Sequence, residues 1–473
     1  MMSRPKSKIL PLVSKGLWLL AVLLVLGGPP RPVGAQAAGP RYRVAEGDTL
    51  YTIALNFGIS LASLQAANPS VDPAALALDQ SLVIPGFEGV EGTLATHTLQ
   101  AGESLDSLAL RLGLARDTLV KLNRVVNPQQ LYLNQAVVIV DQADAGPAVP
   151  FGQTYAARSG AGLLALAAAH NTSPWGLARL NRLATPNRLA PGGTLVAPGG
   201  DRPPLALAYP VRELLVGPWP PTQGETLVVT VISDQPVTLA GQFSDEVLHF
   251  NTDDPASNVQ VALQGLYRLS DPNLYPLSLV ATDAAGVTVA FAQPVPVRAR
   301  DLVYDLPLIV NPATLDPAAT EPENIQVRAV VASVTPRRYW SGLWLAPSVG
   351  QWRSLFGSLR SYNGGPYDSF HGGMDFSGGE DRPITAPASG VVAFTGPLTV
   401  RGNATIIDHG WGVYTGYWHQ SSIVVEVGQP VETGQILGYN GATGRVTGPH
   451  LHWEVYVGGR QVNPLTWTEI IFP

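Results

Sequence analysis

The sequence predicts a multidomain protein: three small α+β modules built as strand–helix–helix–strand, a β-sandwich-like middle region and an all-β C-terminal domain. Three observations lead to this fold class. One skeleton of residues recurs at intervals of 55 and 58 within residues 41–200. Alternation of apolar residues with period two follows from about residue 207, and short strands separated by glycine turns fill the chain after residue 340. A chain of 473 residues is also expected to form three or more domains.

The composition is typical of a folded protein and excludes some functions. Apolar residues make up 45% and charged residues 14% of the chain, so most of it is expected to fold. The net charge of −6 gives no basic surface, so nucleic-acid binding is not expected. There is no cysteine, which rules out disulfides and a lipid-modified cysteine.

Residues 1–38 have the pattern of a signal peptide. Basic residues between Arg4 and Lys15 precede ten apolar residues, Leu17–Leu26, and the small residues of Val33–Ala35 offer a cleavage site. A membrane-spanning helix needs about 20 apolar residues, although an uncleaved N-terminal anchor remains an alternative. We therefore predict a secreted or cell-envelope protein that acts outside the cytoplasmic membrane.

Each repeat is predicted to hold two short helices between two strands. In the first unit, Leu50–Phe57 has apolar residues spaced as one face of a helix. Asp48 or Thr49 is expected to cap this helix, and Ser60 is expected to cap the next. The unit boundaries are predicted at residues 41–86, 96–141 and 154–199.

The units resemble the LysM domain, most closely in the first copy, where the resemblance rests on Gly47–Leu50, Ala67–Pro69 and Ile84–Pro85. LysM domains bind polymers that contain N-acetylglucosamine, such as peptidoglycan and chitin, so the resemblance implies a shallow sugar-binding groove. The third copy is expected to be degenerate, because Ala161 and Gly162 replace the capping pair, and either binding or a spacer role is open for it. The residues expected to contact glycan are Asp48, Thr49, Asn68, Glu103, Ser104 and Asn123.

The region 207–300 is predicted to be an immunoglobulin-like β-sandwich. Alternating apolar residues in Thr226–Ile232, Val237–Ala240 and Leu277–Thr282 predict strands. Its sequence contains no group of catalytic residue types, so a spacer and an extra binding module are both open. Residues 301–339 are expected to form an extended connection with one strand, Ile325–Ser333.

Histidines gather in the C-terminal region in a metal-binding pattern, with five of the eight after residue 370. His450 and His452 lie on a predicted strand, so both rings point to the same face. His371 and Asp375 lie four residues apart further upstream. A catalytic zinc site needs three nitrogen or oxygen ligands and one open position. His371, Asp375 and one of the paired histidines would supply such a set.

Residues 340–473 resemble the lysostaphin-type peptidoglycan metalloendopeptidases, which belong to the duplicated hybrid motif family. The motifs that carry the resemblance are, in order, Ser354–Gly357, Phe370–Phe376, Ala386–Gly390, Gly402–Asn403, Asp408–Gly410, Tyr417–His419, Val427–Gln429, Gly434–Gln435 and Thr447–His452. The resemblance implies that His371, Asp375 and His452 bind one Zn²⁺ per chain. It also implies that His419 and His450 are catalytic histidines that do not bind the metal.

The predicted function is hydrolysis of peptide bonds in peptidoglycan by a secreted zinc endopeptidase that LysM repeats hold on the glycan. Zinc held by two neutral imidazoles and a carboxylate polarises a peptide carbonyl and lowers the pKa of bound water toward about 7. Either His419 or His450 would act as the base. His409, in an Asp-His-Gly turn, is expected to be structural, and Gln420 departs from the leucine common in the family, which affects the adjacent groove wall.

Two alternatives come from other functional classes. One is a non-catalytic cell-wall-binding protein that activates another hydrolase, and the other is an adhesin or wall scaffold. The zinc content of the purified protein distinguishes both from the enzyme. The sequence leaves open which peptide bond is cut and what the oligomeric state is.

Overall fold

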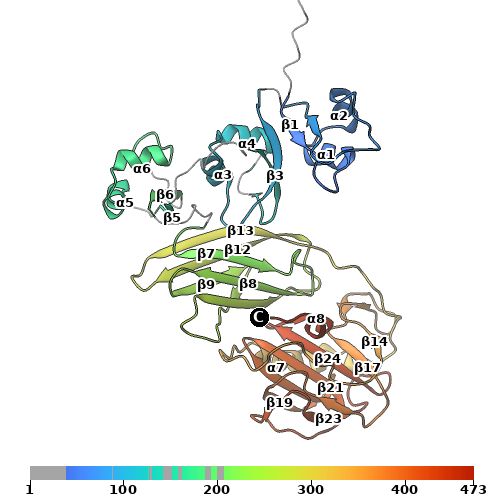
Figure 1. Cartoon of the computed structure of the whole chain (residues 1–473). Coiled ribbons are helices and arrows are strands. Elements are labelled where there is room, and N and C mark those ends of the chain that lie inside the picture. The colour runs from blue at the N-terminus through green and yellow to red at the C-terminus, as the bar shows by residue number, and fades with distance from the viewer. Residues whose placement is uncertain are drawn as a thin grey trace, which may run out of the picture. The chain divides into compact units, whose positions relative to one another are not determined.

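The structure is a computed structural model that describes residues 39–87, 89–125, 127, 130–141, 152–157, 162–186, 193–199 and 207–473. The predicted signal peptide, 1–38, lies outside the described residues. The chain divides into two compact units, Met1–Glu91 and Gly92–Pro473 (Figure 1). Among the described residues, no single helix is long and apolar enough to cross a membrane; the bent pair of helices at Leu50–Ala67 passes by length and composition alone, as buried core helices also do.

The first unit contains one repeat, in which two helices lie between two antiparallel strands. Thr49 caps the first helix, because its hydroxyl accepts a hydrogen bond from the Thr52 amide at 3.0 Å. The carboxylate of Asp48 instead accepts from the Tyr42 hydroxyl at 2.7 Å. Ser60 caps the second helix, as expected. The elements are β1 (Arg41–Arg43), α1 (Leu50–Asn56), α2 (Leu61–Ala67) and β2 (Ser81–Val83).

The second and third repeats have the same order of elements. In the third repeat Gly162 stands at the N-cap and makes no side-chain cap bond. The second repeat consists of β3 (Thr93–Thr98), α3 (Leu105–Leu112), α4 (Arg116–Asn123) and β4 (Ala136–Asp141). The third consists of β5 (Gly152–Ala156), α5 (Leu163–Ala169), α6 (Pro174–Leu180) and β6 (Thr194–Pro198).

The middle region forms two antiparallel sheets, ordered β10-β9-β12-β13 and β11-β8-β7. The inner faces bury alternate residues, such as Leu227 and Val229 on one sheet and Leu277 and Leu279 on the other. The three expected strands correspond to β8, β9 and β12. The elements are β7 (Val211–Gly217), β8 (Thr226–Ser233), β9 (Val237–Phe243), β10 (Glu246–Leu248), β11 (Val259–Gly265), β12 (Asn273–Asp283) and β13 (Thr288–Val297).

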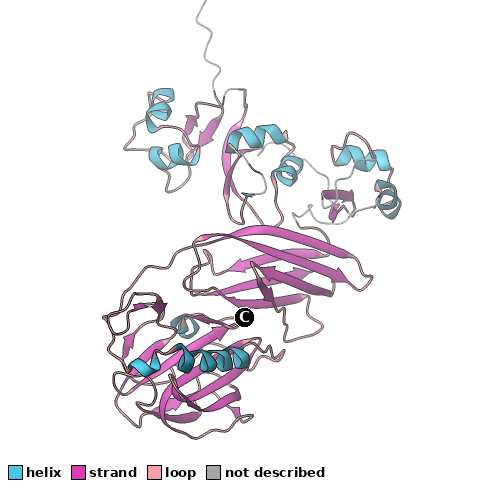
Figure 2. Ribbon diagram, turned by 180° about the vertical axis from the view of Figure 1, so that it is seen from behind, coloured by secondary structure: helices cyan, strands magenta, loops and turns pink. Residues whose placement is uncertain are grey.

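The connection after residue 300 differs from its prediction. The strand expected at Ile325–Ser333 is wrong, because this stretch lies largely within helix α7 (Pro317–Val331), which follows a short 3₁₀ turn at Pro312–Thr314. Asp316 caps α7, and Pro317 occupies its first turn, where a missing N–H costs nothing. Its buried side chains recur every four residues and pack against side chains of the C-terminal sheet, so tertiary packing overrides the β propensity of the valines. The helix lies across this sheet (Figure 2).

The C-terminal domain is built around one large antiparallel sheet, ordered β14-β17-β24-β21-β20-β19-β22, with β18, β23 and β25 paired to it. The all-β prediction is wrong only at the short helix α8 (Pro464–Glu469). The apolar residues of Ile423–Val427 also predict a separate strand, and this prediction is wrong, since Ile423 ends β21 and the exposed Val424 and Val427 follow it into a turn. The remaining elements are β14 (Trp352–Ser354), β15 (Leu359–Arg360), β16 (Ser369–Phe370), β17 (Met374–Ser377), β18 (Pro383–Thr385), β19 (Gly390–Leu398), β20 (Gly402–Gly410), β21 (Val413–Ile423), β22 (Pro430–Val431), β23 (Ile436–Asn440), β24 (His450–Val457) and β25 (Arg460–Val462).

The middle region and the C-terminal domain share one hydrophobic core. Leu263 of β11 is buried in the same cluster as Trp340 and Trp467. The Trp467 indole donates a hydrogen bond to the Thr226 hydroxyl at 3.2 Å. The guanidinium of Arg268, fully buried, donates to the Gly357 carbonyl at 3.1 Å. The middle region is therefore part of the structural support of the C-terminal domain and not a detached spacer.

Candidate active site

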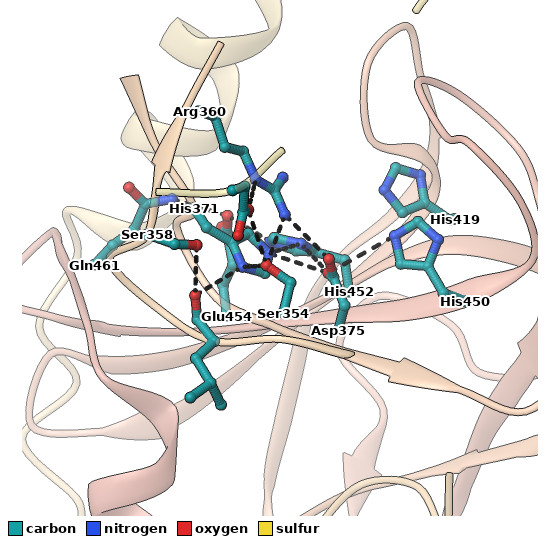
Figure 3. Close-up of polar contacts among 12 residues, drawn as sticks. Ser354, Ser358, Arg360, His371, Asp375, His419, His450, His452, Glu454 and Gln461 are labelled. Atoms are coloured by element: carbon teal, nitrogen blue, oxygen red, sulfur yellow. Dashed lines mark hydrogen bonds and ion pairs between the residues drawn. The ribbon is translucent and has the colours of Figure 1, made fainter. Parts of the chain in front are cut away.

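Three predicted ligands converge between adjacent strands of the C-terminal sheet. Asp375 on β17 lies directly opposite His452 on β24, and His371 precedes β17 by three residues. His371 Nε2 lies 3.0 Å from Asp375 Oδ1 and 2.9 Å from His452 Nδ1, and the latter two atoms are 2.8 Å apart (Figure 3). In the described part of the chain, this is the one group of three or more His, Cys, Asp or Glu side chains arranged to hold a metal.

In each ligand ring, the hydrogen bond of the outer nitrogen, which points away from the other ligands, determines that the inner nitrogen carries the lone pair. His371 Nδ1 faces the Leu355 carbonyl at 3.0 Å, and His452 Nε2 faces the Glu454 carboxylate at 3.0 Å. Both partners accept hydrogen bonds, so each neutral ring carries its proton on the outer nitrogen. Two lone pairs and a carboxylate oxygen then meet within 3.0 Å of one another.

Such an arrangement fits a divalent cation. Three buried electron-pair donors repel one another unless a positive charge lies among them. Tetrahedral zinc with bonds of about 2.0–2.1 Å separates its ligands by roughly 3.3 Å, which is close to the observed distances. Zn²⁺ would be held by His371, Asp375 and His452, with the fourth position open to the adjoining cavity.

Further side chains, which were not predicted from the sequence, hold the ligands in place. Arg360 donates to Asp375 Oδ2 at 3.1 Å and also to Asp305 Oδ2 at 3.1 Å. Ser354 lies between Asp305 and His371, with contacts of 3.1 and 3.0 Å. Asp305 belongs to the connection, more than 60 residues before the first ligand, so no local pattern marks it. Ser354 is the first residue of the motif Ser354–Gly357, and its place in that motif could have identified it from the sequence.

Glu454 supports His452 from the same strand. Its carboxylate accepts from His452 Nε2 and also from Gln461 Nε2 at 2.8 Å and from the Tyr456 hydroxyl. Such a carboxylate behind a ligating histidine fixes the tautomer and the ring orientation. The spacing of two between His452 and Glu454 places both on one face of a strand, a signal that could have identified Glu454 from the sequence.

The electrostatic environment favours the metal-binding protonation states of two ligands. Burial lowers the pKa of His371 to about 4, so this ring is neutral at pH 7. Burial acts to raise the pKa of Asp375, but its contacts with His371 and His452 hold that pKa well below the usual range. Burial acts against protonation of His452, while hydrogen bonds to the carboxylates of Asp375 and Glu454 raise its pKa overall. A metal would take the place of that proton.

His419 and His450 lie side by side next to the three ligands (Figure 3). Their ring centroids are 4.9 Å apart, and His450 Nε2 is 3.7 Å from Asp375 Oδ1. His419 Nδ1 faces the Thr443 carbonyl and His450 Nδ1 faces the Gly448 carbonyl, each at 2.8 Å. Each neutral ring therefore has its lone pair on Nε2, where it accepts a proton.

Burial lowers the pKa of both histidines. For His419 the lowering is large, with a further contribution from the neighbouring His450, and for His450 burial is the main cause. Both rings are thus neutral at pH 7. His419 also has a φ of +67°, in an irregular part of the β20–β21 pairing where β21 has one extra residue. A positive φ outside glycine is uncommon and concentrates at functional sites.

Two glycines between His371 and Asp375 allow these ligands to approach β24. A Cβ on Gly373 would lie 2.1 Å from the Trp453 carbonyl oxygen, and one on Gly372 would lie 2.3 Å from the Gln461 amide nitrogen. The Trp453 oxygen belongs to the backbone and cannot move aside, so packing requires Gly373, whereas the atoms that face Gly372 belong to flexible side chains that can shift.

A cavity of about 440 Å³ opens beside the ligands. His419, His450 and His452 line it on the sheet side. The connection forms another part of its wall through Leu308 and Leu315, and α7 contributes Asn324. The segment predicted as an extended connection is therefore part of the site.

His409 lies apart from the ligands, in keeping with its expected structural role. It is fully buried, with Nδ1 2.8 Å from the Ser389 carbonyl and Nε2 2.8 Å from the Thr415 hydroxyl. Its ring also packs against Trp344, with centroids 4.7 Å apart.

The predicted glycan-contacting residues separate into two groups. The Asn68 amide bonds to the Leu64 carbonyl and to the N–H and C=O of Val83, so it joins a helix to the closing strand. Asn123 makes the equivalent bonds in the second repeat.

Glu103 is buried against His97 and Arg111. These internal contacts give Asn68, Asn123 and Glu103 structural roles within the repeats, and their glycan contacts stay predictions. Thr49 and Ser104 remain exposed at helix caps, and Asp48 is half-buried beside Thr49.

Comparison with known families agrees with this geometry. Residues 369–464 match the model of peptidase family M23, and residues 42–85, 97–140 and 163–198 match that of the LysM domain. The chain thus carries an M23 peptidase domain and three LysM domains, and the resemblances inferred from the sequence are confirmed at the level of these domains.

Curated relatives share the C-terminal domain. Peptidoglycan DD-endopeptidase ShyA of Vibrio cholerae is 45% identical over 95 residues, which cover 20% of this chain and 22% of the relative. DD-carboxypeptidase/endopeptidase Mpg of Neisseria meningitidis is 42% identical over 96 residues, with the same coverage of 20% and 22%. The match therefore spans about a fifth of the length of these relatives.

Similar solved structures include the catalytic domain of lysostaphin from Staphylococcus simulans. It is 27% identical, with a TM-score of 0.21, and the match covers 28% of this chain and 90% of that one. A zinc-containing peptidase from Vibrio cholerae is 19% identical, with a TM-score of 0.26, and the match covers 48% of this chain and 86% of that one.

Proposed function

We propose that the protein is a zinc-dependent endopeptidase that hydrolyses peptide bonds of peptidoglycan in the cell envelope or outside the cell. The observation that carries the proposal is the meeting of three potential metal ligands, His371, Asp375 and His452, with two neutral histidines at one open cavity. Bound Zn²⁺ would act as a Lewis acid toward the peptide carbonyl and the attacking water. The names of the relatives make D,D peptide bonds the first substrates to test.

The two unliganded histidines would move protons. Nε2 of His450 lies nearest to the ligands and is proposed to take the proton of the attacking water and to return it to the leaving amine. Nε2 of His419, which also carries a lone pair in the neutral ring, is proposed as the alternative base. The carbonyls of Thr443 and Gly448 hold both rings in the tautomer that leaves Nε2 facing the site. The three predicted metal ligands and both predicted catalytic histidines are all present at the site, which argues against a non-catalytic role.

The three LysM domains are proposed to hold the enzyme on the glycan strands. Successive modules on one chain raise the effective concentration of each other at a polymer, so weak single contacts add up to firm attachment. Thr49, Asp48 and Ser104 are the retained candidates for glycan contact.

The test compares the zinc-loaded wild type with His452→Ala and His450→Ala. Muropeptides released from purified sacculi are identified by mass spectrometry, and bound zinc is measured by elemental analysis. We expect His452→Ala to lose both zinc and activity, and His450→Ala to keep zinc and to lose about 10²–10⁴-fold in rate. Release of no muropeptide by the wild type with zinc bound would reject the enzymatic function. Equal zinc content in the two variants would reject the assignment of ligand and base.

A further inference from the structure

Three arginines line the cavity beside the candidate metal site, and two of them are neutralised within the protein. Arg360 contacts the carboxylates of Asp305 and Asp375. Arg401 pairs with the buried Glu323 of α7 at 2.7 Å. The third is Arg445, and no carboxylate oxygen of the described residues lies within 4.0 Å of its guanidinium. Asp368 also lines the cavity but makes no ion pair with it.

The contacts of Arg445 orient its guanidinium and leave most of its donors free. One nitrogen donates to the Thr314 carbonyl at 3.1 Å, and the guanidinium lies over the Tyr362 ring at 4.7 Å. This is its one side-chain hydrogen bond to the described part of the chain, whereas a guanidinium has five N–H donors. Burial lowers the pKa of Arg445, and repulsion from Arg360 and Arg401 contributes. An anion bound to the Arg445 guanidinium would offset both the burial of its charge and the repulsion from the two other arginines.

The position of Arg445 ties it to the reacting groups. It lies on the loop between β23 and β24, midway between Thr443, whose carbonyl holds His419, and Gly448, whose carbonyl holds His450. Its own amide donates to the Val400 carbonyl at 2.7 Å, which fixes the loop against the neighbouring strand connection. The same loop thus presents a partly buried, unpaired cation and positions both histidines in one cavity.

We propose that Arg445 is a specificity-determining residue that binds a free carboxylate of the substrate next to the scissile bond. The inference rests on the proposed function and deepens it. The enzyme is then expected to prefer peptides whose residue beside the scissile bond carries a free carboxylate. Peptides that have a carboxamide there, or no such group, should be poorer substrates. A guanidinium recognises a carboxylate through two parallel hydrogen bonds and loses this partner on amidation.

The test uses two synthetic peptides that differ only in a carboxylate or a carboxamide beside the scissile bond, and the zinc-loaded full chain. The wild type is expected to cleave the carboxylate peptide with a kcat/KM about ten- to a hundredfold higher, the range of a charge-assisted hydrogen bond. Arg445→Gln keeps a donor for the Thr314 carbonyl but removes the charge. Its preference is expected to fall to near one, with an unchanged melting temperature and a carboxamide rate within a few-fold of wild type.

Arg382→Gln serves as the matched control, because exposed Arg382 lies on the same domain but does not line the cavity. It should keep the full preference. Equal rates of the wild type on both peptides would overturn the proposal. An equal loss on both peptides in Arg445→Gln would do the same, since that is the result of a structural role.

Failure of the proposed function gives a different result. If the wild type cleaves neither peptide, calorimetric titration of the intact peptides decides about the carboxylate site. Tighter binding of the carboxylate peptide by the wild type, lost in Arg445→Gln, supports the site without the enzymatic function. Equal binding of both peptides by the wild type overturns it.

Discussion

Removal of the metal is expected to destabilise the structural body formed by the middle region and the C-terminal domain. His371 Nε2, His452 Nδ1 and Asp375 Oδ1 lie within 3.0 Å of one another, so removal of a cation would leave three buried electron-pair donors facing each other and would remove its contribution to folding. A metal present at 100 times its dissociation constant stabilises the folded state by about 2.7 kcal/mol. Since 1 kcal/mol shifts the Tm of a folding unit of this size by about 2–4 °C, chelation should lower it by roughly 5–11 °C.

Differential scanning calorimetry of the full chain, with zinc and with a chelator, measures this shift. Because Leu263 of the middle region is buried among tryptophans of the C-terminal domain, both parts should melt together in one metal-dependent transition. The transition of the first LysM domain, which forms a separate unit, serves as the internal control. His452→Ala should melt at the same temperature in both conditions. A wild-type Tm that does not respond to the chelator, or a His452→Ala variant that responds as the wild type does, would refute the reasoning.

Four other outcomes are expected. Burial lowers the pKa of His409 to about 4, below its unfolded value of about 6.5. The unfolded state therefore binds more protons, and stability falls as the pH drops from 6.5 toward 4. His409→Gln should reduce the difference in unfolding free energy between pH 7 and pH 5, measured by urea unfolding, by about 2 kcal/mol. Glu323→Ala leaves Arg401 buried without its partner and should cost about 3–5 kcal/mol in the same assay, whereas an exposed change, Glu321→Ala, should cost little. Leu263→Ala removes most of a buried side chain from the shared core and should cost about 2–5 kcal/mol of stability. The Tm of the metal-dependent transition should fall as a result. A lower Tm of the first LysM domain instead would contradict the shared core. Residues 41–200 should sediment with insoluble peptidoglycan and residues 207–473 far less, and equal sedimentation would reject the anchoring role of the LysM domains.

The fold was predictable where the sequence repeats or alternates locally. The asparagines of the LysM repeats, the cap residues Thr49 and Ser60, and the period-two strands β8, β9 and β12 are all relations among near neighbours. The sequence of helix α7 predicts a strand because its valines favour β structure, while the contacts that stabilise the helix lie on β19, β20, β21 and β24, much later in the chain. The internal contacts of Asn68 and Glu103 were not predictable for a related reason, since a polar residue at a turn has the same sequence pattern whether it faces a ligand or its own backbone.

The types and spacing of the groups in the candidate site follow from the local order of residues. A strand repeats every two residues, so His450 and His452 had to share a face, and the four-residue spacing of His371 and Asp375 over two glycines restricted how those ligands approach β24. The groups that surround these ligands depend on how distant segments pack together. Asp305, Arg360, Glu323 and Arg445 come from segments that are far apart along the chain, and their contacts form when the connection packs against the sheet. Such contacts depend on how the chain folds back on itself, and that information is not contained in the local order of residues around either partner.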